Sequence, residues 1–157
     1  MILLGTFQIE FPRPLKQIND LCIEGKIVEE IIVQNGHTNF ESTYFKFMPF
    51  IPPDKLDELY DRATIIISHA GSGSILKGVK KGKKVIAIAR LKKNAECVDD
   101  HQLEILDEFA RMGYILPWNE NDSLVEILEK AEHFVPQKYV SQKEVIISFL
   151  ENYIDSL

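Results

Sequence analysis

The sequence predicts an α/β fold with a mostly parallel, doubly wound sheet. Short runs of β-favouring residues alternate along the chain with helix-compatible stretches, the pattern that parallel strands with crossover helices produce. Glycine or proline follows most of the strand-like runs, as expected where strands end in turns. The length of 157 residues fits one domain that buries roughly two-thirds of its unfolded surface. We therefore expect a single domain over residues 1–157.

Six short apolar segments are expected to form the strands of this sheet. The first ends at Gly5, the second ends at Asn35-Gly36, and prolines follow the third. The run before Ser68 is rich in isoleucine, as is typical of a strand that is buried on both faces. The expected strands are 2–4, 30–34, 44–47, 64–67, 85–89 and 114–116.

Helix-compatible stretches separate the strands. Proline opens the first helix and Gly25 follows it, which is the usual asymmetry of helix ends. Gly113 is expected to end the fourth helix. The first of these helices is expected from about Pro12 or Pro14 to Cys22, and the second over 54–62. The third follows the segment 68–75 and reaches Lys81, and the fourth is expected over about 99–112.

Two capping boxes predict the last two helices. Ser123 with Glu126 opens one, and Ser141 with Glu144 opens an amphipathic helix at about 141–155. The apolar residues of this last helix recur at helical spacing, so they either pack back on the sheet or form part of a docking surface. They are Val145, Ile146, Phe149, Leu150, Tyr153 and Ile154.

Charge disfavours nucleic acid as a partner of the whole surface. The net charge is -6, whereas proteins that bind phosphate backbones usually present a basic face. Seven lysines nevertheless lie close together in sequence around and after Gly82. A solvated face near a helix C-terminus is the interpretation that we favour, and a site for anionic lipid is the alternative. These lysines are Lys77, Lys80, Lys81, Lys83, Lys84, Lys92 and Lys93.

No metal, cofactor or targeting segment is expected. Cys22 and Cys97 lack metal-ligand spacing, and isolated cysteines fit a reduced compartment. The apolar start of the chain is too short for a signal peptide, and no apolar run approaches the ~20 residues of a membrane span. We therefore expect a cytoplasmic protein.

The segment 68–75 is the most informative part of the sequence. It lies between an expected strand and an expected helix, where open α/β sheets bind ligands. Its two glycines allow close backbone approach, its serines add hydroxyl groups, and His69 adds a ring donor. The helix start offers unpaired N–H groups and a partial positive charge, so the segment predicts a phosphate site. The glycines and serines are Gly71, Ser72, Gly73 and Ser74.

Five motifs in order resemble the nucleotide-sugar-binding half of GT-B glycosyltransferases. They are Gly5-Thr6, Gln34-x-Gly36, Phe50-Ile51, His69-x-Gly71-x-x-Ser74 and Asp100-His101-Gln102. The chain is most similar to the small family 28 C-terminal domains. These include the soluble subunit of the dolichol-linked chitobiose UDP-GlcNAc transferase and the PssE-like proteins of exopolysaccharide and capsule synthesis. The resemblance covers residues 1 to about 116 and implies a single Rossmann-like domain, the donor half of a GT-B fold.

The resemblance also implies a UDP-sugar site. His69 and Ser74 match residues that face the diphosphate, and Gly5-Thr6 matches a second turn near the phosphates. Two short turns at adjacent strand ends are able to enclose a diphosphate. The full donor-binding set expected from the resemblance is Gly5, Thr6, Ile51, His69, Gly71, Ser72, Gly73, Ser74, Lys77, Asp100 and Gln102.

The remaining matches concern the base and the sugar. Ile51 matches the backbone against which the uracil lies, and Asp100 and Gln102 match a pair that touches the sugar hydroxyls. Each match has a structural alternative. In these alternatives Ile51 is a core residue and Gly36 only forms a tight turn. Asp100 is a favourable acid in the first turn of its helix, and Gln102 is a solvated side chain. For His69 the alternative is a helix cap or a bond to a neighbouring carbonyl.

Lys77 departs from the family pattern. Many GT-B enzymes have a glutamate at the matching position, and its carboxylate accepts both ribose hydroxyls. A lysine cannot accept a hydrogen bond, so that contact is lost or replaced by donation. Either the nucleotide binds more weakly or the chain is an auxiliary subunit.

The resemblance implies half of an enzyme. A GT-B active site lies between two Rossmann-like domains, and the chain has residues for one. The other half and the general base are expected on a membrane-associated partner, which recruits the chain to the inner face of the membrane. The expected reaction is inverting transfer of a sugar from a UDP-sugar to a polyprenyl-diphosphate-linked saccharide, without a metal.

Two other functions stay open from the sequence. A non-catalytic enhancer would stabilise the membrane partner and bind UDP-sugar poorly. A flavodoxin-like or dinucleotide module would need G-x-G-x-x-G after the first strand, and the loop beginning Gly5-Thr6-Phe7-Gln8 does not fit that pattern.

Overall fold

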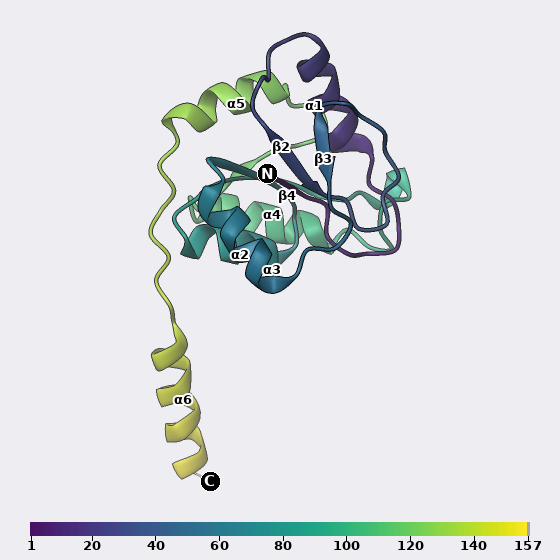
Figure 1. Ribbon diagram of the computed structural model, residues 1–157. Coiled ribbons are helices and arrows are strands. Elements are labelled where there is room, and N and C mark those ends of the chain that lie inside the picture. Colours follow the sequence, from purple (N-terminus) through teal and green to yellow (C-terminus); the bar gives the residue numbers. More distant parts are fainter. Residues whose placement is uncertain (157) are drawn as a thin grey trace.

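Residues 1–156 are described by a computed structural model, in which they form one six-stranded parallel sheet (Figure 1). The strand order is β3-β2-β1-β4-β5-β6. This confirms the predicted mostly parallel, doubly wound α/β fold. The strands are β1 Ile2–Leu3, β2 Ile31–Gln34, β3 Phe45–Phe47, β4 Ile65–His69, β5 Lys84–Ile88 and β6 Leu116–Pro117.

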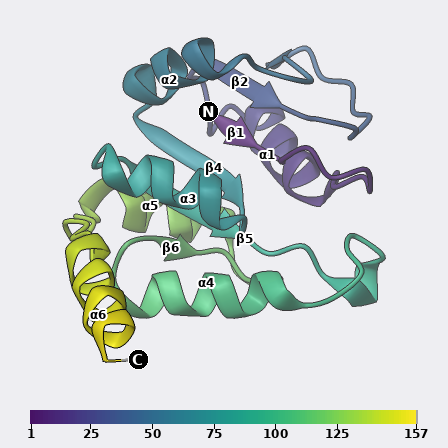
Figure 2. The same ribbon diagram turned by 90° about the horizontal axis from the view of Figure 1, so that it is seen from below.

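Helices cover both faces of the sheet. One face packs against α1 and α5, and the other packs against α2, α3 and α4. Figure 2 shows β2, β1, β4, β5 and β6 following one another across the molecule between these layers. The helices are α1 Arg13–Ile23, α2 Pro53–Arg62, α3 Ser72–Lys80, α4 His101–Arg111, α5 Leu124–His133 and α6 Lys143–Asp155, with a 3-10 turn at Lys92–Asn94.

The two cores follow from the alternation of side chains along the strands. In β1 and just beyond it, Ile2 and Leu4 belong to the core beneath α1 and α5, whereas Leu3 belongs to the core beneath α3. In β4, Ile67 and Ile66 divide in the same way. Apolar side chains therefore point to both sides, as the isoleucine-rich run predicted.

The last strand lies slightly later than expected. Gly113 has a positive φ of 69° and Tyr114 N–H still bonds the carbonyl of Phe109, so residue 114 belongs to the turn that follows α4. The ladder begins at Leu116, and Pro117 is accommodated because β6 is an edge strand.

Only one of the two expected serine caps is present. The Ser123 hydroxyl accepts a bond from Glu126 N–H at 3.5 Å and caps α5. The Ser141 box is wrong, because α6 begins at Lys143 and the Ser141 hydroxyl instead accepts from Lys143 N–H at 3.2 Å. Such a local bond competes with the longer-range cap.

The apolar stripe of α6 is not packed on the sheet. This helix stands apart from the body at the end of an extended segment that follows α5 (Figure 1). The stripe is exposed, from 50% at Leu150 to 68% at Phe149. Among residues 1–156 no helix is long and apolar enough to cross a membrane. The expectation that the stripe packs back on the sheet is therefore not met, and the stripe is left exposed as a docking surface would require.

Much of the lysine cluster has local partners. Lys81 pairs with Asp61 at 2.6 Å, Lys83 donates to the Asp61 carbonyl at 2.6 Å, and Lys84 donates to the Glu132 carbonyl at 2.6 Å. These contacts support the favoured interpretation of a solvated face with capped helix ends.

Candidate functional site

The carboxyl ends of β1 and β4 bring the two predicted glycine turns together. Leu3 of β1 pairs with Ser68 of β4, and Gly5 and Gly71 each lie two residues beyond their strand. One strand leads to α1 on one face and the other leads to α3 on the opposite face. The turns therefore diverge at the switch point of the sheet, where open α/β sheets bind ligands.

The ring of His69 lies between two glycine backbones. A Cβ placed on Gly5 would lie 2.8 Å from Nε2 of His69, and a Cβ placed on Gly71 would lie 2.3 Å from the same atom. Gly36 is equally confined, because its Cβ would lie 2.3 Å from the Gly5 carbonyl oxygen. Gly5 and Gly36 also have positive φ values of 78° and 55°. These three glycines are thus required for packing, whether or not a ligand is bound.

The ring of His69 has a defined orientation. Its Nδ1 lies 3.3 Å from the Leu3 carbonyl, which is able only to accept, so Nδ1 carries the proton in this contact. Burial lowers the pKa of His69, and the nearby charge of Arg90 lowers this pKa further. Nε2 is then an acceptor. The predicted donation from His69 to a phosphate therefore requires that the ring first gain a proton.

The start of α3 offers free backbone donors. Gly71 is the N-cap, with extended backbone and no capping side chain. The first bond of the turn runs from Ile75 N–H to the Gly71 carbonyl at 3.2 Å, so the N–H groups of residues 72–74 precede it. Ser72 and Gly73 are exposed, and Thr6 is exposed after β1. This geometry suits an anionic group.

The turns after β2 and β3 form the next part of this edge. Ile51 is buried at 8% exposure, so its side chain is core and only its backbone is available to a base. Phe50 is 58% exposed, and its ring meets the His37 ring edge-on at 5.5 Å. Gly36 N–H bonds the Pro49 carbonyl and joins the two turns.

Lys77 is directed toward α2. Its ammonium lies 3.2 Å from a carboxylate oxygen of Asp57 and 5.3 Å from the centre of the Tyr60 ring. Hydrogen bonding from Lys77, with a smaller effect of Lys81, lowers the pKa of Asp57. A lysine–aspartate pair thus occupies the region where the family pattern has a single glutamate.

Asp100 and Gln102 hold the loop after β5. Gln102 Oε1 accepts from Arg90 N–H at 3.1 Å, so the alternative of a solvated side chain is wrong. Asp100 is the N-cap of α4, and its carboxylate accepts from Lys92 N–H at 3.0 Å. Both side chains therefore lie beyond β5, which neighbours β4 in the sheet.

Sequence reasoning missed a buried charged cluster beside this loop. Arg90 and Glu96 are 1% and 5% exposed, and Arg13 makes a bidentate ion pair with Glu96 at 2.8 Å. The available signal was an arginine directly after the apolar run 85–89, at a strand end that faces the site. Among residues 1–156 no three His, Cys, Asp or Glu side chains are grouped so as to hold a metal ion.

Comparison with models of known protein families gives a match over most of the chain. Residues 15–157 match the model of the glycosyltransferase family 28 C-terminal domain. The chain belongs to this family.

Curated relatives of this family 28 domain include UDP-N-acetylglucosamine transferase subunits named ALG13. The Yarrowia lipolytica protein is 35% identical over 71 residues, which are 45% of this chain and 34% of that protein. The Saccharomyces cerevisiae protein is 38% identical over 55 residues, 35% of this chain and 25% of that protein. The similarity thus spans about a third or less of the length of these two relatives.

Solved glycosyltransferases share the fold of this family 28 domain. MurG of Acinetobacter baumannii has a TM-score of 0.56 at 17% identity, over 84% of this chain and 40% of that one. The glycotransferase of kitacinnamycin has a TM-score of 0.57 at 14% identity, over 84% of this chain and 33% of that one. The fold likeness supports the predicted single Rossmann-like fold.

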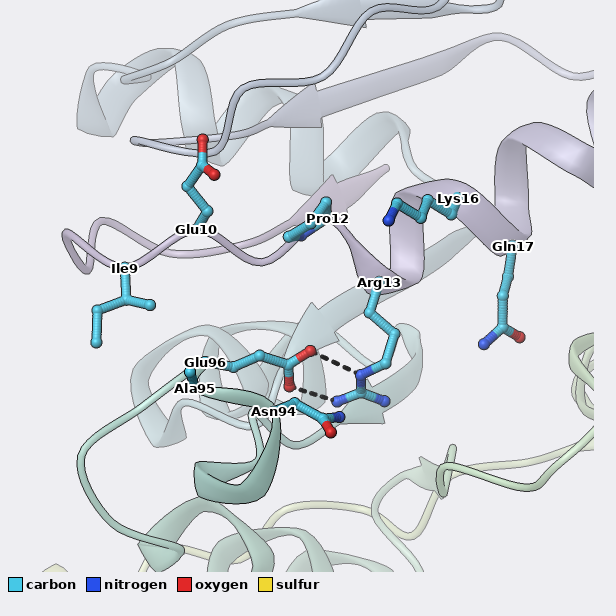
Figure 3. Close-up of a pocket in the computed structure, with 9 residues that line it drawn as sticks. All are labelled: Ile9, Glu10, Pro12, Arg13, Lys16, Gln17, Asn94, Ala95 and Glu96. Atoms are coloured by element: carbon cyan, nitrogen blue, oxygen red, sulfur yellow. Dashed lines mark hydrogen bonds and ion pairs between the residues drawn. The ribbon is translucent and has the colours of Figure 1, made fainter.

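An open hollow of about 710 Å³ lies beside the switch point of this family 28 domain (Figure 3). Its walls are the loop that precedes α1, the first turns of α1, and residues 94–96. None of its lining residues belongs to the predicted donor-binding set. The ion pair of Arg13 with Glu96 spans the hollow between the two loops.

Proposed function

We propose that this chain is the donor-binding subunit of a two-component inverting glycosyltransferase. It would bind a UDP-sugar, and the sugar would pass to a polyprenyl-diphosphate-linked saccharide. The observation that carries the proposal is the meeting of two glycine turns and the free start of α3 around His69 at the switch point. Family membership supports nucleotide-sugar chemistry.

The names of the relatives favour one sugar donor and one class of acceptor. Their names are those of UDP-N-acetylglucosamine transferase subunits, so we take UDP-N-acetylglucosamine as the donor. These relatives are not named for exopolysaccharide or capsule synthesis, which the sequence analysis expected. A lipid-linked oligosaccharide is therefore the acceptor class that we propose.

In this proposal the chain stabilises the leaving group. The acceptor hydroxyl attacks the anomeric carbon while the bond to UDP breaks, and negative charge grows on the diphosphate. The N–H groups of residues 72–74 and the positive end of α3 would meet that charge. Protonated His69 would add a charged donor from Nε2. These groups supply the stabilisation that a divalent cation provides in other transferases.

The acceptor and the general base would come from a second, membrane-associated chain. The switch-point edge is open in this domain, with Thr6, Ser72 and Gly73 exposed to whatever closes the cleft. The apolar stripe of α6 is the surface that we assign to the docking of this partner, because six large apolar side chains lie exposed there. Recruitment to the inner face of the membrane follows from this docking.

A non-catalytic enhancer subunit is the second candidate. The observation that favours it is the pairing of Lys77 with Asp57, which leaves no free carboxylate at the position of the family glutamate. Such a subunit would keep the fold and α6 but bind the donor weakly.

Titration of the full chain with UDP separates the two candidates. We expect heat on calorimetry and amide shift changes at Gly5, Thr6 and residues 71–74, with ADP as the control for recognition of the base. Unchanged shifts at millimolar UDP would contradict donor binding and favour the enhancer. Sugar transfer should require the membrane partner, so transfer by the purified chain alone would overturn the two-subunit proposal.

A further inference from the structure

Arg90 connects the two loops that border the candidate donor site. It lies two residues beyond β5 and is 1% exposed. Its Nη1 donates to the carbonyls of Ile9 at 2.6 Å and Glu96 at 3.0 Å, and its Nη2 donates to the carbonyl of Leu4 at 3.0 Å. One guanidinium therefore bonds the backbone on both sides of Gly5-Thr6 and the backbone of the loop after β5.

Two aromatic rings lie close to this guanidinium. Its central carbon lies 4.8 Å from the ring centre of Phe11 and 5.7 Å from that of Phe7. Both rings belong to the segment between β1 and α1. The main chain of Arg90 adds a third connection, because its N–H donates to Gln102 Oε1.

Arg13 makes the reverse connection. It begins α1, after the β1 loop, and its Nη2 donates to the Ala89 carbonyl at 2.7 Å. Its bidentate pair holds the Glu96 carboxylate, which also accepts from Leu91 N–H at 2.9 Å. Arg90, after β5, therefore bonds the loop after β1, and Arg13, after the β1 loop, bonds the segment after β5.

Such a connection requires arginine. A planar guanidinium presents several donors in fixed directions, whereas a lysine ammonium is a single flexible point charge. Separating the two loops would break the hydrogen bonds that Arg90 and Arg13 make across them, and it would leave the buried Glu96 carboxylate without Arg13. Nε of Arg90 is buried without a hydrogen-bond partner, so the connection rests on the two Nη atoms. One loop carries Gly5-Thr6, and the other leads to Asp100 and to Gln102 in the first turn of α4.

We propose that Arg90 is a positioning residue of the donor site, and that with Glu96 and Arg13 it forms a clamp that sets the phosphate turn against the sugar-binding start of α4. Arg90 acts through the backbone, because it is too buried to touch a ligand itself. The contacts within the chain support the statement that these three residues hold the two loops together. The expected effect of the clamp on UDP binding rests on the proposed function. The clamp fixes the phosphate turn, not the base-binding edge at Ile51, so it should matter for UDP and not for uridine.

The test compares Arg90→Lys with wild type in the full chain. We expect UDP affinity to fall about tenfold, since misplacing a positioned group by an ångström has effects of this order or more, and uridine affinity to change less than about twofold. Amide hydrogen exchange without ligand should quicken together in residues 5–10 and 91–96. Arg62→Lys is the matched control, because Arg62 is exposed and pairs weakly with Glu30 at 3.8 Å.

A second variant covers the case in which Arg90→Lys does not fold. Glu96→Gln keeps the side-chain size and releases Arg13, so exchange should quicken at 91–96 and UDP should weaken more than uridine. Equal weakening of UDP and uridine, or faster exchange in one loop only with Arg90→Lys, would overturn the proposal. If wild type binds no UDP, the donor proposal fails. Amide hydrogen exchange in the two loops then tests the clamp independently of any ligand.

Discussion

The Nε2 atom of His69 faces the backbone of Gly71 so closely that a Cβ built on this glycine would lie 2.3 Å away. The ring is also held by the Leu3 carbonyl and by Gly5, so it has no room to move aside. We expect Gly71→Ala to lower the free energy of unfolding by about 1–3 kcal/mol, the usual effect of forcing extra volume into a packed site. Urea denaturation measures this, and an unchanged midpoint would show that the ring does move.

Gly73 provides the matched comparison. A Cβ at this position meets nothing within 4 Å, and its φ is not positive. Alanine is the better helix former, so Gly73→Ala should raise the free energy of unfolding by up to about 1 kcal/mol. If a diphosphate lies on the first turn of α3, the same methyl group should weaken UDP binding on calorimetry. Greater stability with unchanged UDP affinity would place the ligand elsewhere.

Donor binding should take up a proton at His69. Burial holds the pKa of His69 below its ordinary value of 6.5 in the free chain, and a bound diphosphate would raise it again. Affinity for UDP-N-acetylglucosamine should therefore rise by at most about tenfold per pH unit as the pH falls from the raised pKa of the bound ring toward the lowered pKa of the free ring. This ligand is suitable because its phosphates are diesters that do not titrate in that range.

Stability of the free chain should depend on pH in the opposite direction. Because the folded pKa of His69 is lowered, the neutral ring is favoured by folding, and stability is lost as the pH falls from 6.5 toward the lowered value. His69→Gln removes the titrating group and should flatten both profiles. A pH-independent affinity in wild type would mean that Nε2 does not donate to the ligand.

Substitution of Lys77 tests whether the ribose lies at the position that the family pattern implies. Lys77→Glu alone would face the carboxylate of Asp57, so the variant should be made together with Asp57→Asn. The added acceptor should strengthen uridine binding by about 1–3 kcal/mol if both ribose hydroxyls reach it. Lys77→Met with Asp57→Asn is the control for loss of the ammonium. Equal uridine affinity in the two double variants would argue against this position for the ribose.

The strands, most helix ends and the meeting of the two glycine turns were predictable because their signals are local. Gly25 and Gly113 have positive φ at the ends of their helices, and Gly5 and Gly71 follow strands that the alternation of elements makes neighbours. The Ser141 box failed although it has the same signature as Ser123. Within residues 1–156 no side chain of α6 is buried, so tertiary contacts do not override the local Ser141 bond to Lys143.

The clamp was not predictable for a different reason. Charged side chains are expected on the surface, and Arg13 is 83 positions away from Glu96 in the chain. Only the parallel order of β1, β4 and β5 brings their loops together. Side chains whose partners come from distant loops leave no periodic signal in the sequence.

The last prediction concerns α6. A chain that ends at Val140 loses exposed apolar side chains and few packed ones, so its free energy of unfolding should stay within about 0.5 kcal/mol of the full chain. It should, however, no longer co-purify with the membrane-associated subunit that we propose. Phe149→Asp in the full chain tests the stripe, and Ser148→Asp, on the opposite side of the helix, is its control. A large drop in the unfolding midpoint on truncation would mean that α6 packs on the domain in solution. Retention of the partner by the Phe149→Asp chain would mean that the subunits meet through another surface.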